Sequence, residues 1–230
     1  MGIIARLVPV DGANRNKLVV ATTHLLWNPK RGDIKFAQLR YFMSEVKRMS
    51  FSYNRPGHDP VILCGDFNTV PNTPILEFIL QGEVNPVGFG RKEMSGQQPG
   101  RGRTVCKEDL ILRGVGMDSS VLENEESWRE NVSCLILDSE KAPVVSHPFQ
   151  FRSVYRPTKR DGMPYASTKI EGESFLVDHI FYASSGTLRC LGYRKLMSRD
   201  QLDHIGWLPD EVIPSDHLPL EAKFLLTPQF

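Results

Sequence analysis

The stretch Pro60-Val61-Ile62-Leu63-Cys64-Gly65-Asp66-Phe67-Asn68 gives the clearest indication of the fold. It is apolar on both faces before it ends in polar side chains, as expected of a central strand that is buried on both sides. Asp66 and Asn68 stand two positions apart, so an extended backbone directs both side chains to the same side. Gly65 permits a close approach of neighbouring backbone. The sequence therefore places a carboxylate and a carboxamide together at the end of a buried strand.

Strand and helix patterns surround this segment. Residues 2–8 and 17–24 have strand character and flank a turn at 11–14, which predicts a hairpin. From Asp33 apolar residues recur every three or four positions with Lys35, Arg40, Lys47 and Arg48 between them, which predicts an amphipathic helix. A second helix is predicted from Thr73-Pro74 to Gly82. Further strands are predicted at 149–155, 175–182, 193–197 and 218–225, and a short helix at 200–205.

The 230 residues, 40% of them hydrophobic, suit a single domain, and the mixture of strands with a few helices predicts an α/β (α+β) fold. The expected architecture is two sheets, or one sheet covered by helices. Residues 82–110 lose periodicity and gain Gly, Gln, Pro and Arg, which predicts a long mobile loop.

Composition excludes several classes of protein. The net charge of +1 is too small to give an overall electrostatic field that would attract nucleic acid or a membrane surface. No apolar run is long enough to span a bilayer. The four scattered cysteines indicate a reducing compartment, hence a cytoplasmic location with a nuclear one left open, and no disulfide-linked partner. No zinc-type spacing is present, so any metal should be a hard ion held by carboxylates.

Four polar clusters stand at the ends of predicted strands: Thr22-Thr23-His24, Gly65-Asp66-Phe67-Asn68, Val177-Asp178-His179 and Ser215-Asp216-His217. Turn formation is an alternative explanation for the second and fourth clusters, and a satisfied strand-end histidine for the first. Asp178 is harder to explain in this way, because a carboxylate in an apolar strand needs a partner, for which a functional histidine is a candidate. Asp216 and His217 reach one site only if they precede the regular part of their strand.

Other polar groups have a structural interpretation. His58, His147, His179 and His204 are expected to be structural or exposed. The basic segments 91–92, 101–103 and 156–160 are interpreted first as solvated loops, with phosphate contact as the alternative.

In their order along the chain, the four clusters resemble the endonuclease/exonuclease/phosphatase superfamily, and within it the branch of Angel proteins, nocturnin and the carbon-catabolite-repressor deadenylases. The segment 22–35, Thr-Thr-His-Leu-Leu-Trp-Asn-Pro-Lys-Arg-Gly-Asp-Ile-Lys, is the most specific part and is similar to Angel proteins. Segments 153–155, 177–182 and 215–220 extend the resemblance to the C-terminus. It implies a two-sheet β-sandwich flanked by helices and a Mg²⁺-dependent hydrolase acting on RNA.

The resemblance also implies a role for each site residue. Asp66 would orient or deprotonate the attacking water, and Asn68 would hold that site and a phosphate oxygen. His217 would stabilise charge on the phosphorane, with its tautomer fixed by Asp178. His24 would donate to a phosphate oxygen, and Asp216 would help to bind metal.

One departure from the family pattern concerns the N-terminal part. The family begins with a strand carrying Asn and a later strand carrying the Glu that is the main metal ligand, whereas residues 1–23 contain no Glu. We therefore expect a domain that lacks its N-terminal strands, with weak metal binding and exposed sheet edges. An RNA 3′-end enzyme, either a 2′,3′-cyclic phosphatase or a 3′-5′ exonuclease that removes tails, and a truncated, inactive family member both remain open. The oligomeric state is not predicted.

Overall fold

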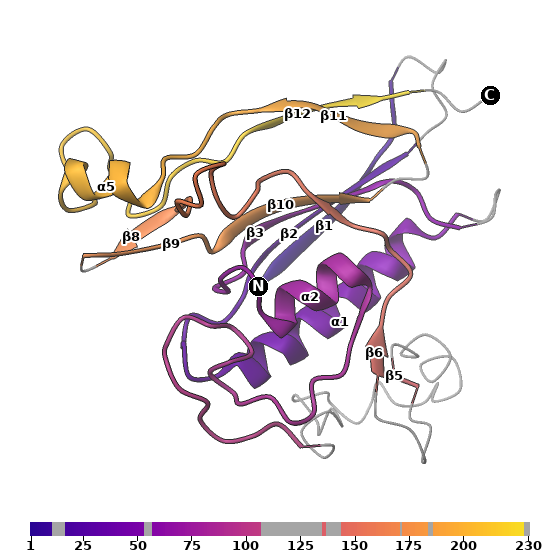
Figure 1. Ribbon diagram of the computed structural model, residues 1–230. Coiled ribbons are helices and arrows are strands. Elements are labelled where there is room, and N and C mark those ends of the chain that lie inside the picture. The colour runs from indigo at the N-terminus through magenta and orange to yellow at the C-terminus, as the bar shows by residue number, and fades with distance from the viewer. Residues whose placement is uncertain are drawn as a thin grey trace.

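The structure, a computed structural model, describes residues 1–10, 17–52, 57–106, 135–136, 144–170, 172–183 and 186–227. Its centre is a five-stranded sheet with the order β1-β2-β3-β10-β7 (Figure 1). The strands are β1 Gly2–Leu7, β2 Leu18–His24, β3 Val61–Asp66, β10 Asp178–Ala183 and β7 Arg152–Ser153. β2 and β3 run parallel, and the other neighbours are antiparallel. The predicted hairpin and the predicted central strand are both confirmed.

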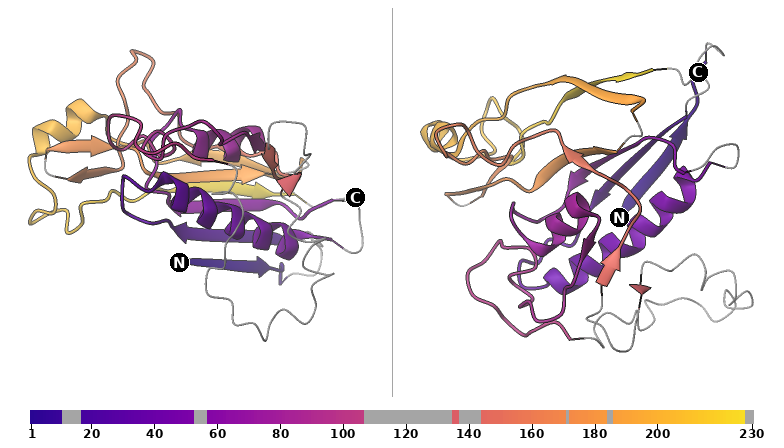
Figure 2. Two further views of the ribbon diagram at one scale, coloured as in Figure 1. Left: turned by 90° about the horizontal axis from the view of Figure 1, so that it is seen from below. Right: turned by 45° about the vertical axis from the view of Figure 1, so that its right-hand side comes forward.

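Two helices, α1 Gly32–Ser50 and α2 Pro74–Gln81, cover one face of this sheet (Figures 1 and 2). Their apolar sides and the sheet share one core, to which α1 contributes Phe36, Leu39 and Met43. One expectation for α1 is wrong: Lys35 and Arg40 were assigned to its polar side, yet their exposures are 0% and 4%. Lys35 lies four residues before Leu39, so helical geometry turns both toward the core.

A hairpin of β11 Leu188–Tyr193 and β12 Ala222–Leu226 lies on the other side of the sheet (Figures 1 and 2). A second, smaller core joins Ile180 and Tyr182 of β10 to Cys190 and Phe224 of the hairpin. Together with the helices, this gives the predicted two-sheet sandwich. The strand predicted at 193–197 is instead β11, which ends at Tyr193, and only the second half of the segment 218–225 is a strand.

The remaining elements are short: β4 Glu83–Val84, β5 Leu135–Ile136, β6 Val144–Ser146, β8 Thr168–Ile170, β9 Glu173–Phe175 and α5 Arg199–Ile205. The helix predicted at 200–205 is confirmed as α5. The strand predicted at 149–155 is only two residues long, and that predicted at 175–182 divides into β9 and β10. The break has a structural cause, because β9 pairs with β8 whereas β10 joins the central sheet.

The predicted loop 82–110 is wrong at its start, where Glu83–Val84 form β4 paired with β6. Residues 85–106 are irregular, as predicted, but they are anchored to the rest of the protein. Met94 and Val105 are buried in the main core, and the amide of Gly32 donates to the carbonyl of Arg91. Residues 107–110 of the predicted loop lie outside the described residues, and its mobility remains a prediction. Among the described helices, none is long and apolar enough to cross a membrane.

Candidate active site

Three neighbouring strands place His24, Asp66 and Asp178 in one row across the sheet. In the register, His24 of β2 is opposite Asp66 of β3, and Asp66 is opposite Asp178 of β10. Alternate residues of these strands, such as Ala21, Leu63 and Phe181, are buried against the helices. Since side chains alternate between the faces of a sheet, the three polar groups lie on the face opposite the helices.

The end of β3 has a backbone that few sequences can adopt. Gly65 has a φ of +133°, and a Cβ atom there would lie 1.9 Å from the carbonyl oxygen of Thr23. Glycine therefore permits the close approach of β2 to β3 that brings His24 beside Asp66. Beyond the strand Phe67 turns into the main core, and Asn68 takes a φ of 47°, in the left-handed region that asparagine tolerates.

Asn68 holds the carboxylate of Asp66 from two directions. The backbone amide of Asn68 donates to Oδ1 of Asp66 at 2.8 Å, and its side-chain amide donates to Oδ2 at 3.1 Å and to the carbonyl of Leu25 at 3.1 Å. Its own Oδ1 accepts from Nε2 of Gln97 at 3.3 Å. The side chain is buried, so these contacts fix the position of Asp66. Phosphate binding by Asn68 remains a prediction.

Asp178 and His217 form a carboxylate–imidazole pair. Nδ1 of His217 lies 2.8 Å from Oδ2 of Asp178, and the Ser167 hydroxyl donates to the same oxygen at 2.7 Å. The Ser167 hydroxyl oxygen also accepts from the amides of Val177 and Asp178 at the start of β10. The pair predicted from the sequence is therefore present, and Ser167 orients it.

The turn before β12 brings Asp216 and His217 to the site. Its backbone is fixed by Lys169, whose amide donates to the carbonyl of Asp216, and by the Ser215 hydroxyl, which accepts from the amide of His217. Oδ2 of Asp216 lies 4.0 Å from Nε2 of His217. Both side chains thus reach one site before the strand begins, as the sequence required.

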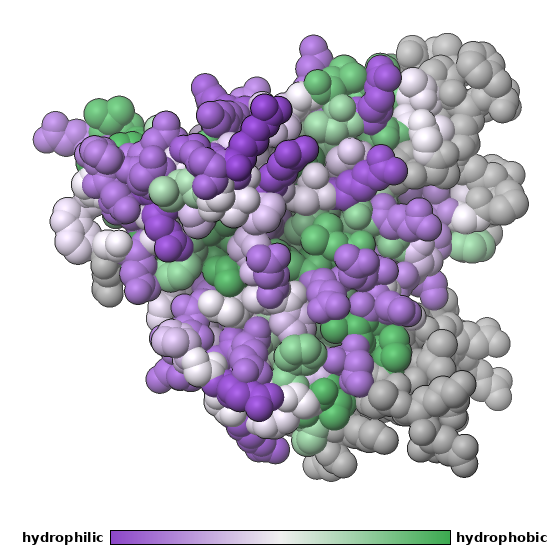
Figure 3. Space-filling model, in the orientation of Figure 1, coloured by the Kyte–Doolittle hydropathy of each residue, from purple (hydrophilic) through white to green (hydrophobic). Residues whose placement is uncertain are grey.

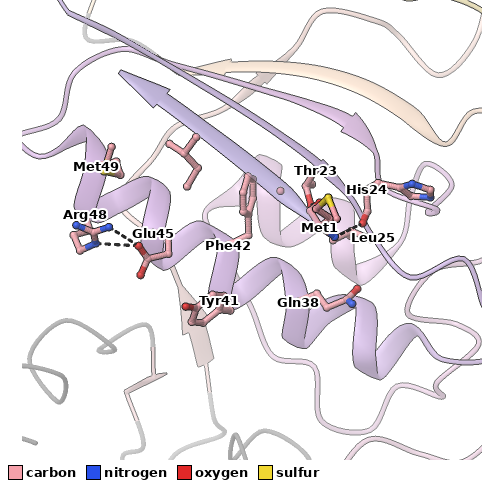
Figure 4. Close-up of a pocket in the computed structure, with 12 residues that line it drawn as sticks. Met1, Thr23, His24, Leu25, Gln38, Tyr41, Phe42, Glu45, Arg48 and Met49 are labelled. Carbon is pink, nitrogen blue, oxygen red and sulfur yellow. Dashed lines mark hydrogen bonds and ion pairs between the residues drawn. The ribbon is translucent and has the colours of Figure 1, made fainter. Parts of the chain in front are cut away.

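His24 lies at the open side of the row. Its Nε2 is 3.4 Å from Oδ2 of Asp66, while two thirds of its side chain is exposed. His24 also lines a groove of about 450 Å³ that lies between the start of β1 and α1. Figure 4 shows Phe42 in the middle of this groove, His24 at one end, and the ion pair of Arg48 with Glu45 near the other.

Burial and charge shift the pKa values of two groups in the row. Burial raises the pKa of Asp66, and the facing carboxylate of Asp178 raises it further, against the effect of the hydrogen bond from Asn68. The hydrogen bond to Asp178 raises the pKa of His217. The site thus combines two groups. One is a half-buried carboxylate whose charged form a nearby cation would stabilise, and the other is an imidazole that tends to hold a proton.

The donor set fits a hard divalent cation. Asp66, Asp178 and His217 present ligand atoms within 4.8 Å of one another, and Asp216 adds a partly exposed carboxylate beside them. Because Asp178 and His217 are bonded to each other, Asp66 and Asp216 are the better candidates for metal. Mg²⁺ uses one or two carboxylates together with water and phosphate oxygens, which suits such a pair.

Three residues of the site were not predicted from the sequence: Lys35, Gln97 and Ser167. Nζ of Lys35 donates to the carbonyl of Asn68 at 2.7 Å and to the Ser95 hydroxyl at 3.3 Å, and it also contacts Gln97. Burial lowers the pKa of Lys35 to about 8. Its helical spacing from Leu39 was a usable signal, whereas nothing in the local sequence marks Gln97 or Ser167.

No protein-family model matches the chain, but a comparison with known proteins finds several relatives of similar kind. Protein angel homolog 2 of Danio rerio is 31% identical over 100% of the chain and 44% of its own length. The Bos taurus protein is 30% identical over 98% of the chain and 47% of its length. Carbon catabolite repressor protein 4 homolog 3 of Arabidopsis thaliana is 29% identical over 98% of the chain. The chain spans about half the length of these relatives.

Solved structures agree with the sequence relatives. The crystal structure of ANGEL2, a 2′,3′-cyclic phosphatase, in complex with adenosine-2′,3′-vanadate superposes with a TM-score of 0.79 at 30% identity, over 98% of this chain and 61% of that one. The human nocturnin catalytic domain has a TM-score of 0.51 at 16% identity and thus shares the fold. Fold and site define this chain as part of an endonuclease/exonuclease/phosphatase domain. Within that superfamily it belongs to the Angel-like branch and corresponds to the C-terminal part of those proteins.

Proposed function

We propose that the chain supplies the C-terminal part of a Mg²⁺-dependent phosphoesterase active site that removes 2′,3′-cyclic phosphates from RNA 3′ ends. The observation that carries this proposal is the row of His24, Asp66 and Asp178 with His217 bonded to Asp178. The likeness to a 2′,3′-cyclic phosphatase at 30% identity favours a cyclic phosphate over a polyadenylate tail. The substrate is RNA because a 2′,3′-cyclic phosphate forms only on ribose.

Removal takes two successive hydrolyses, in each of which a water oxygen attacks the phosphorus and the bond from phosphorus to one ribose oxygen breaks. The first opens the ring to a phosphomonoester and the second releases inorganic phosphate, and in each the proton lost by the water passes to the leaving ribose oxygen. Asp66 orients the water and accepts its proton, and His217 donates to the charged phosphate oxygens while Asp178 fixes its orientation. His24 donates to a further phosphate oxygen. A divalent cation held by Asp66 and Asp216 would neutralise negative charge on the phosphate.

Phosphoryl transfer of this kind needs positioning and charge stabilisation more than covalent chemistry. Asn68, Lys35 and Ser167 provide the positioning, since each holds a site residue through hydrogen bonds. A deadenylase would use the same groups, and the substrate experiment below distinguishes the two activities.

A second candidate is a non-catalytic family member. It is favoured by the outer strand β1, whose exposed Ile3 and Leu7 indicate a sheet that normally continues or is covered. A chain of this kind would bind RNA ends but would turn them over slowly or not at all.

The test is to incubate the purified chain and Mg²⁺ with RNA ending in a 2′,3′-cyclic phosphate and, separately, with polyadenylated RNA. The enzyme is favoured if the cyclic phosphate is opened and if EDTA or His217→Asn abolishes this reaction. His204→Asn, which changes an exposed histidine away from the site, is the control and should leave the reaction unchanged. Shortening of the tail would replace the cyclic phosphatase with a deadenylase.

Binding resolves the remaining outcomes. Binding of a nucleoside 2′,3′-cyclic phosphate that Asp66→Asn or His217→Asn weakens, without turnover, favours the non-catalytic candidate. Turnover or binding that is indifferent to both variants would contradict the assigned site.

A further inference from the structure

A second cavity, of about 460 Å³, is lined by three basic side chains and two tyrosines: Arg156, Lys159, Arg160, Tyr165 and Tyr193. We call it the basic pocket. It contains the basic segment 156–160, for which the sequence left open a solvated loop or a phosphate contact. The segment does not extend freely into solvent, because it folds against two aromatic side chains and encloses a cavity with them.

The basic pocket is close to the catalytic cluster along the backbone. Tyr165 precedes Ser167 by two residues, and Ser167 donates to Asp178. Two residues of extended chain span about 7 Å. The amide of Tyr165 donates to the carbonyl of Pro157 at 3.0 Å, which folds the basic segment back onto the tyrosine. A polymeric ligand whose terminal unit lies at His217 would therefore have its preceding units within reach of the basic pocket.

The charges in the basic pocket are only partly compensated. Nζ of Lys159 lies 3.2 Å from Oδ2 of Asp161, and Asp200 also acts on it. Arg156 and Arg160 are exposed, and in the described part of the chain no carboxylate forms an ion pair with either. Two guanidinium groups, each able to donate two parallel hydrogen bonds to a phosphate, thus remain available.

The tyrosines supply an apolar surface beside these charges. Tyr193 is 50% exposed, and its ring packs edge-on against Tyr155 with centroids 5.1 Å apart. Tyr155 is itself fixed, since its hydroxyl donates to the carbonyl of Glu221 and accepts from the amide of Glu221. An immobilised, half-exposed ring next to cationic groups is the arrangement that binds single-stranded nucleic acid, with bases on the ring and phosphates on the cations.

We propose that the basic pocket binds the nucleotides that precede the terminal one in a single-stranded RNA substrate. Arg156 and Arg160 contact the phosphates, and Tyr193 stacks on a base. The proposal rests on the proposed function for the identity of the polymer as RNA. It adds that the length of the RNA, and not only its cyclic end, determines affinity.

The test compares binding of adenosine 2′,3′-cyclic phosphate with binding of a fluorescent adenosine hexanucleotide that has the same end. The double variant Arg156→Gln/Arg160→Gln should bind the hexanucleotide at least tenfold more weakly and the mononucleotide unchanged. Single-stranded RNA loses about 0.7 in the slope of log K against log salt for each phosphate contact, so the slope should fall by about 1.4. Arg189→Gln/Lys223→Gln removes the same charge from two exposed positions of the β11–β12 hairpin, outside the basic pocket and the groove at His24, and should leave both affinities unchanged.

Stacking has its own comparison. Tyr193→Leu should weaken hexanucleotide binding about tenfold, and Tyr193→Phe should keep it, because the ring and its packing on Tyr155 remain. Equal loss in the two double variants, or no loss in Arg156→Gln/Arg160→Gln, would overturn the basic pocket as a site. If the mononucleotide fails to bind while the hexanucleotide binds through Arg156 and Arg160, the proposed function fails and the pocket stands.

Discussion

At the scale of single residues, Asp178 has the widest influence in the site. It fixes His217, is fixed by Ser167, and lies opposite Asp66 of the neighbouring strand β3. Its carboxylate is mostly shielded from water, and each hydrogen bond to it is therefore stronger than the same bond would be in water. Loss of the Asp178 carboxylate should therefore change the orientation and the pKa of His217 even without bound substrate.

We predict that Asp178→Asn lowers the pKa of His217, which the carboxylate holds above the usual 6.5. A histidine with a raised pKa in the folded protein adds stability below pH 6.5 that is lost as the pH rises through its folded pKa. Titration of the His217 ring by NMR measures the shift, and the exposed His204 provides an internal reference. An unchanged His217 titration in Asp178→Asn would contradict the pairing.

Lys35 gives the second prediction at this scale. Its pKa is about 8 in the folded chain against an ordinary value of 10.5, so between these pH values the unfolded chain binds the Lys35 proton more tightly than the folded chain does. Stability should rise with pH across this window, by up to about 3 kcal/mol from 1.36 kcal/mol per pKa unit. Lys35→Met should remove most of the rise.

Urea unfolding at pH 7.5 and at pH 10 measures this effect. Lys47→Met, on the same helix but only half-buried, is the matched control and should retain the rise. Parallel pH dependence in Lys35→Met and in the unchanged chain would refute the burial of a charged Lys35.

At the scale of elements, the contact between β2 and β3 depends on Gly65. Alanine there would combine a positive φ with a Cβ atom 1.9 Å from the carbonyl oxygen of Thr23. We predict that Gly65→Ala lowers the free energy of unfolding by more than about 3 kcal/mol, since both backbone strain and the strand spacing must change.

Gly192→Ala in β11 is the control, because its Cβ would meet no atom within 4 Å and its φ is not positive. Denaturant unfolding of both variants, or the soluble yield if Gly65→Ala does not fold, gives the comparison. Equal stability of the two would show that β2 and β3 do not approach as closely as the register requires.

The sequence predicted the elements whose contacts are local and missed those whose limits are set elsewhere. The hairpin 2–24, α1, β3 and α2 follow from periodicity and turn residues within each segment. The break between β9 and β10 does not, because it arises where the chain leaves one sheet for another. Likewise, the pairing of Asp178 with a histidine was predicted from the cost of a buried charge, whereas Ser167 lies in a bend just before β8, where no motif marks it.

At the scale of the whole molecule, no described element covers the β1 side of the central sheet on the face opposite the helices. The hairpin β11–β12 packs on β10, while Ile3 and Leu7 of β1 are 66% and 50% exposed. Hydrophobic residues also reach the surface in the middle of the face seen in Figure 3, between that hairpin and the helices. Such a surface on an edge strand favours association of chains.

We predict that Ile3→Lys/Leu7→Lys reduces self-association at high protein concentration while changing the melting temperature by no more than a few degrees, because neither side chain is buried. Light scattering coupled to size-exclusion chromatography measures the association. Trp207→Lys/Val212→Lys adds the same charge at two other exposed apolar positions and should have a smaller effect. If the two double variants behave alike, net charge and not the edge strand governs solubility.

The row of polar groups also has a kinetic consequence. His179, next to Asp178, bonds to the carbonyl of Thr69, 110 residues earlier in the chain, so β3 and β10 meet only after a very long loop has closed. Non-local pairings of this kind form late in folding, after local hairpins and helices. No partly folded species holding only β1, β2 and α1 can contain the site. A chain emerging from the ribosome would thus bring the groups of the candidate site together in a single late step, and a ligand of the site would act as a reporter of complete folding.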